Sequence, residues 1–203
     1  MPDAKSAKIA GRQLSIIVPG TWANVPVDGP ISARRFVKDL VRSRVGTEDR
    51  LASLRAELVD VTMRNVMAAM EIGVHTYLMS FELLPSIPFT GAMLMADIPW
   101  PDESRPGLGD TDIPRALREG FPGGAVLDLE MGPVLRTVET TESALEGQPI
   151  TSLDIQYQVP YPTLEKVLYI RVNLPVAPAL EPILRLFDRI VDTITFLDPP
   201  DQA

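Results

Sequence analysis

Two stretches in the last third of the chain alternate strictly between apolar and polar residues. Residues 150–160 read ITSLDIQYQVP and place apolar side chains at every second position from Leu153 onward, and residues 167–175, VLYIRVNLP, repeat the pattern. A period of two is the geometry of a β-strand with one face on a core and the other toward water. The alternation therefore predicts an antiparallel sheet with one polar face.

Further strands are expected earlier in the chain. Their residues are β-branched, aromatic or aliphatic, and turn-forming Gly and Pro separate them. These segments are 13–20, 74–84, 91–98, 125–131 and 133–143.

Four segments show helical spacing of apolar residues: 31–46, 47–72, 110–121 and a closing helix with a stripe from Leu180 to Ile194. The order of strands and helices predicts an α+β fold, with an antiparallel sheet of about six to seven strands sandwiched by helices. We expect a flexible N-terminus at 1–12, one domain at 13–197 and a loose tail at 198–203.

Composition excludes several functions. The 203 residues carry a formal charge of −8, which argues against general nucleic-acid binding and against a polybasic membrane-surface role. The chain has no cysteine, which excludes disulfides, thiolate metal sites and a cysteine nucleophile. The first residues lack the apolar run of a secretory signal, and no window approaches 18 clean apolar residues. We therefore expect a soluble cytoplasmic protein without membrane insertion.

The C-terminal quarter resembles a known family. The matching residues are YxVPxP at 157–162, VLYI at 167–170, NLP at 173–175 and LFDxIVxTIxF at 186–196, together with VPGTW at 18–22. They resemble uncharacterised actinobacterial proteins and, more loosely, the Mog1/PsbP-like superfamily with its LpqN-like lipoproteins. The resemblance implies an antiparallel sheet sandwiched by helices. It also implies a binding or adaptor role, because members act on a small GTPase, on photosystem subunits or as chaperones for secreted effectors. It supplies no catalytic residues.

Candidates for chemistry are few. His75 is the only histidine, so it cannot build a multi-histidine metal site, and a structural role is favoured. Asp128 and Glu130 share one strand face, as paired catalytic carboxylates would, but the same spacing arises on any solvated face. No phosphate-binding glycine motif or serine elbow is present. We expect no enzyme, no cofactor and no metal site.

The methionines and loop aromatics are the candidate partner-binding residues. Methionine clusters form deformable apolar surfaces that accept varied partners, yet the same residues also fill cores, and the pattern leaves both interpretations open. Aromatics in loops either close the ends of the sandwich or line a pocket. The candidates for partner binding are Met63, Met67, Met70, Met79, Met93, Met95, Trp22 and Trp100, with Tyr161 and Phe121 as further loop aromatics.

The favoured function is a non-enzymatic adaptor or chaperone-like module that buries an apolar segment of another protein, such as a secretion or assembly substrate. One alternative is a structural subunit of a larger assembly. A second is a small-molecule-binding protein or enzyme with a pocket of Trp22, Trp100 and His75. The sequence does not specify an oligomeric state.

Overall fold

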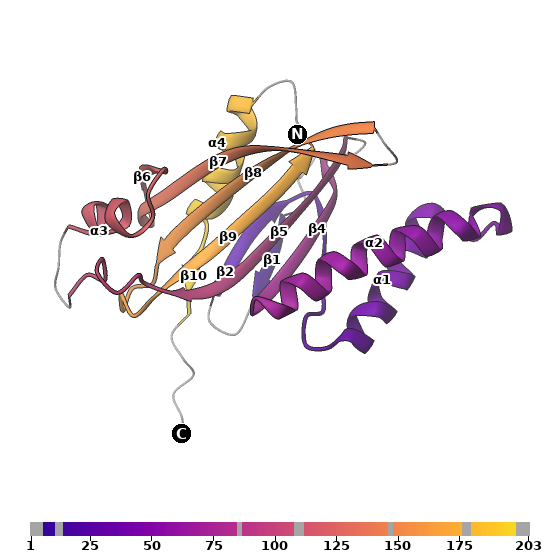
Figure 1. The fold of residues 1–203 in the computed structure, drawn as a ribbon, viewed down its shortest axis with the longest axis horizontal. Coiled ribbons are helices and arrows are strands. Elements are labelled where there is room, and N and C mark those ends of the chain that lie inside the picture. The colour runs from indigo at the N-terminus through magenta and orange to yellow at the C-terminus, as the bar shows by residue number, and fades with distance from the viewer. Residues whose placement is uncertain are drawn as a thin grey trace.

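A seven-stranded antiparallel sheet forms the centre of the molecule (Figure 1). The structure is a computed structural model that describes residues 6–10, 14–84, 87–107, 112–145, 148–175 and 180–197. In spatial order, the strands are β3 (Thr21–Val25), β4 (Val74–Leu84), β5 (Ile87–Pro99), β9 (Lys166–Pro175), β8 (Gln148–Pro160), β7 (Gly132–Leu145) and β6 (Ala125–Leu129).

A second, smaller sheet joins the two ends of the described chain. It has three strands in the order β1 (Ser6–Ala10), β2 (Leu14–Pro19) and β10 (Thr195–Phe196). The N–H of Ile17 in β2 donates to Oγ1 of Thr193 at 3.0 Å, just before β10. Strand β1 pairs with β2 and lies inside the N-terminal segment 1–12. Five residues are too short a pattern for this pairing to be predicted from the sequence.

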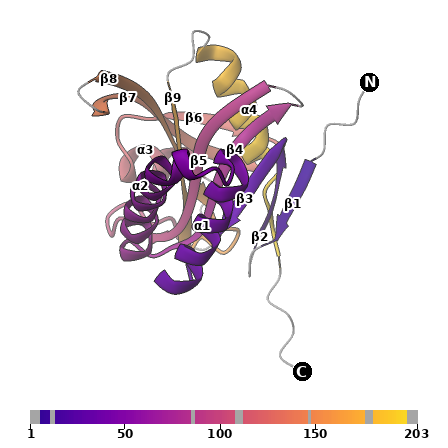
Figure 2. The same cartoon turned by 90° about the vertical axis from the view of Figure 1, so that its right-hand side faces the viewer.

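Helices cover both faces of the large sheet (Figure 2). Helix α4 (Leu180–Asp192) and the small sheet lie on one face, where they share a core with the large sheet. The other face carries α1 (Pro30–Val45), the short 3-10 helix η1 (Asp49–Leu51), α2 (Ala52–Glu71) and α3 (Ile113–Gly120). The α+β class, the number of strands and the helical sandwich expected from the sequence are confirmed.

One corner lets consecutive strands enter different sheets. Gly20 separates β2 from β3 and has a φ of 82°, a left-handed conformation that a side chain disfavours. The chain can therefore leave the small sheet and enter the edge of the large one within a single residue.

The polar face of the large sheet is only partly exposed to solvent. Asp154 and Gln158 occupy the polar positions of the alternating strand β8, yet both are buried. The expectation that this face points to water is wrong at these two positions. The reason for Asp154 lies next to it on β9, where Arg171 and Asn173 donate hydrogen bonds to its carboxylate.

No helix in the described part of the chain is long and apolar enough to cross a bilayer. The loose tail expected at 198–203 lies outside the described residues.

Candidate functional site

The sheet separates the six candidate methionines into two groups. Met93 and Met95 of β5 are fully buried on the face that carries α4. Met63, Met70 and Met79 belong to the opposite core, under α1 and α2. Successive strand residues point to opposite faces, so no single groove can gather all six.

Met67 is the one candidate methionine that reaches the surface substantially. Its exposed fraction is 38%, whereas that of Met63, one turn earlier on α2, is 5%. Both line a surface hollow of about 580 Å³ that also contains Pro30 and Arg34 of α1. The methionine stripe of α2 is therefore core along one edge and accessible along the other.

The candidate aromatics do not form one pocket. Trp22 lies in strand β3 rather than in a loop, and its Nε1 donates to the carbonyl of Pro19 at 2.8 Å. It packs against the core that includes α4. Trp100 is buried under α3, with its ring 6.0 Å from that of Phe121. The two tryptophans thus belong to separate cores.

His75 does have partners. Its Nε2 lies 3.5 Å from Oδ1 of Asp97. Tyr161 donates a hydrogen bond to the same Oδ1 at 2.7 Å, and Lys166 donates one to Oδ2. Burial opposes ionisation of Asp97, but the hydrogen bonds from Lys166 and Tyr161 outweigh it and hold the pKa of this carboxyl below its usual value. Burial lowers the pKa of His75 despite Asp97. Through Asp97, the cluster ties β4 and β5 to the start of β9.

Other acidic candidates are solvated. Asp128 and Glu130 are exposed, and Glu130 lies 3.9 Å from Arg189. Among the described residues, no group of three or more histidine, aspartate or glutamate side chains is placed to hold a metal ion.

The helical hairpin of α1 and α2 has an accessible surface with several hollows in the described part of the chain. Helix α1 starts at Pro30, which suits a first helical turn, and Gly46 follows its last residue with a φ of 91°. Arg55 of α2 donates to the carbonyls of Gly46 and Glu48, both at 2.9 Å. These bonds fix the connection between the two helices.

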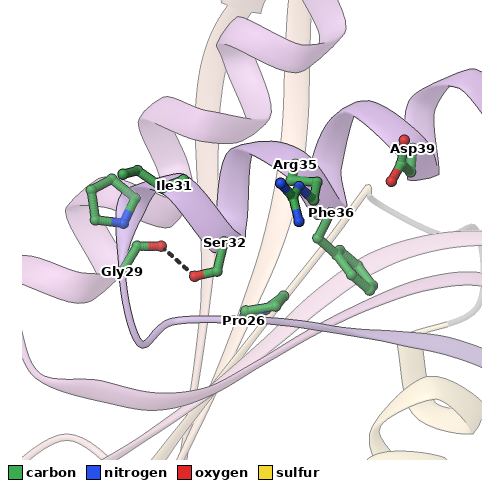
Figure 3. A pocket seen from close by; sticks show the side chains of 8 residues that line it. Pro26, Gly29, Ile31, Ser32, Arg35, Phe36 and Asp39 are labelled. Atoms are coloured by element: carbon green, nitrogen blue, oxygen red, sulfur yellow. Dashed lines mark hydrogen bonds between the residues drawn. The ribbon is translucent and has the colours of Figure 1, made fainter.

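In the described part of the chain, three open hollows are lined in part by α1. The first, of about 600 Å³, lies between the helix and the connection from β3, where Pro26 lies across from Arg35 and Phe36 (Figure 3). The second is the hollow of Met63 and Met67. The third, of about 480 Å³, runs between the helices, and its lining includes Arg34, Lys38, Asp39, Val41, Arg42, Arg55, Val59 and Asp60. We call the exposed side of α1 and α2 around these hollows the hairpin surface.

Sequence reasoning missed the cations of this surface. Helix α1 contains five basic residues and one acidic residue, although the whole chain carries −8. The signal was present in the run from Arg34 to Arg44, but the net charge of the chain obscured it.

No protein-family model matches the chain, and no curated protein sequence matches it. Among solved structures, it is similar to a mutant of protein Mog1, with 8% identity, 97% of both chains covered and a TM-score of 0.47. It is also similar to the Saccharomyces cerevisiae Ran-binding protein Mog1p, with 9% identity, 97% of both chains covered and a TM-score of 0.49. At these identities the likeness concerns the fold alone.

Proposed function

We propose that this chain is a protein-binding module that docks an apolar segment of a partner on the hairpin surface. The observation that carries the proposal is the exposure of large apolar side chains beside the hollows. Ile31 is 82% exposed and lines the first hollow, and Met67 lines the second. Exposed Leu54 and Leu58 extend the apolar character along α2.

The mixture of side chains favours a protein over a small molecule as the ligand. Small-molecule sites are concave and bury most of their ligand, whereas these hollows are shallow and open. Protein interfaces combine an apolar core with a polar rim, and Met and Arg are more frequent in them than on the rest of the surface. Met67 lies beside Arg34 and Arg64 in such a setting. An adaptor or chaperone-like role agrees with this surface, since an unbranched methionine adjusts to different partners.

The experiment is a capture of partners from an extract of the native host, followed by mass spectrometry and by rebinding of the purified candidate. The test variant is Ile31→Asp with Met67→Glu, and the matched control is Leu180→Glu, which alters an exposed apolar residue on α4. Circular dichroism verifies that each variant is folded.

A partner that binds the unaltered chain and the Leu180 variant, but not the double variant, supports the proposal. If no protein is enriched over beads alone, or if the double variant retains every partner with unchanged affinity, the hairpin surface is not a protein-binding site.

A further inference from the structure

Four exposed residues of α1 lie in one line along the hairpin surface. Ile31, Arg35, Lys38 and Arg42 follow one another at intervals of four, three and four residues, which places them on one side of a helix. The line extends over about 17 Å of helix axis. We call these four residues the basic stripe.

The cations of the basic stripe form no ion pair within the described part of the chain. Arg34, next to the stripe, pairs with Asp60 of α2 at 3.3 Å. No hydrogen bond or ion pair from a described residue reaches the side chains of Arg35, Lys38 or Arg42. A concentration of unpaired positive charge on a chain of net negative charge attracts a partner of opposite sign.

We propose that the basic stripe binds an acidic segment of the partner protein, in the form of an amphipathic helix of about three turns. This inference rests on the proposed function and specifies the partner's chemistry. Carboxylates at matching intervals would pair with Arg35, Lys38 and Arg42, and an apolar residue at one end would contact Ile31 and enter the first hollow.

The acidic neighbours of the stripe favour a protein over a nucleic acid. Asp39 and Asp60 line the third hollow together with Lys38 and Arg42. A polyphosphate backbone presents continuous negative charge to such carboxylates, which repel it. A peptide helix carries discrete charges and can place an uncharged residue opposite each carboxylate.

The test selects peptides of about 16 residues, or about four helical turns, from a phage-displayed random library on the full chain. The strongest sequences are then synthesised, and their affinity is measured by fluorescence anisotropy. The test variant is Arg35→Glu with Arg42→Glu. Its control is Arg105→Glu with Arg118→Glu, which changes the net charge equally at exposed residues outside the hairpin.

The inference requires that selected peptides are acidic. Their affinity should fall at least about tenfold in the test variant, remain unchanged in the control, and weaken as salt is raised, because exposed charges are screened.

Three results overturn it: selection of neutral or basic peptides, equal loss of affinity in test variant and control, or tighter binding of a single-stranded oligonucleotide at the stripe. If apolar peptides are selected and only the Ile31 and Met67 double variant fails to bind them, the proposed function stands and the acidic partner is wrong. If the library yields nothing and the extract yields no partner, both fail.

Discussion

Asp154 and Arg171 meet between adjacent strands of the large sheet, with the carboxylate Oδ1 2.8 Å from the guanidinium Nε. The side chain of Asp154 is 3% exposed, while that of Arg171 is 46% exposed. Asn173 and Thr141 donate further hydrogen bonds to the same carboxylate, at 3.1 and 3.2 Å. A buried anion is thus held by three donors from the strands on either side of β8.

Replacement of Asp154 by Ala should destabilise the fold, because three donors lose their acceptor. We expect a decrease of about 1–3 kcal/mol in the free energy of unfolding, measured by urea denaturation. The control is Glu139→Ala, which removes the exposed carboxylate directly opposite on β7 and should change stability by less than about 0.5 kcal/mol. Equal effects of the two substitutions would contradict a structural role for the Asp154 network.

Asp154 should also make the free energy of unfolding depend on pH. Burial opposes its ionisation, but the hydrogen bonds from Arg171 and Asn173 outweigh burial and lower its pKa from the usual 3.8. Because the folded-state pKa is lowered, ionised Asp154 stabilises the fold. This contribution to the free energy of unfolding is complete above pH 3.8 and disappears as the pH falls through the folded-state pKa. Urea denaturation at a series of pH values below 3.8 should therefore show that the free energy of unfolding falls less steeply with pH for Asp154→Asn than for the unaltered chain. Identical curves would exclude the linkage.

Two methionines one helical turn apart should respond differently to truncation. Met63→Ala should cost about 2–3 kcal/mol of unfolding free energy, because it leaves a cavity in the core under α1 and α2. Met67→Ala should cost less, about 1 kcal/mol or below, because 38% of this residue is already exposed and less buried apolar surface is lost. Chemical denaturation measures both. Similar losses would show that Met67 is packed as core and is not free to meet a partner.

The tyrosines should resist ionisation until the protein unfolds. Burial raises the pKa of Tyr77, Tyr157, Tyr161 and Tyr169, all four in the chain, above the usual 10.0. Their contribution to stability is complete below pH 10.0 and decreases as pH rises toward the folded-state values, since the unfolded chain ionises first.

Tyrosinate absorbance and far-ultraviolet circular dichroism should therefore change together in an alkaline titration. In denaturant, the same absorbance should rise near pH 10. A tyrosine that ionises near that pH while the circular dichroism remains native would contradict the burial argument for that residue.

The alternation of strands β8 and β9 was predictable because a period of two fixes which side chains share a face. The same holds for α4, whose apolar stripe from Leu184 to Val191 forms part of a core. These patterns are local, so the sequence displays them directly.

Other features depend on which distant segments become neighbours. The burial of Asp154 requires Arg171 on β9, and the division of the methionines requires β5 to lie between two helical layers. Neither follows from spacing alone. The basic stripe was detectable from the intervals between Arg35, Lys38 and Arg42, but only if the charge of one helix is considered apart from that of the chain.

The hydrogen bond between Ile17 and Thr193 joins residues 176 positions apart. At about 5–20 residues per second, a ribosome needs roughly 10–35 seconds to make the intervening chain. Throughout that interval, the apolar side of β2 lacks the α4 residues that cover it in the finished core. Newly made chains therefore pass through a period in which Leu14, Ile16 and Val18 are open to aggregation, and synthesis rate should influence the yield of folded protein.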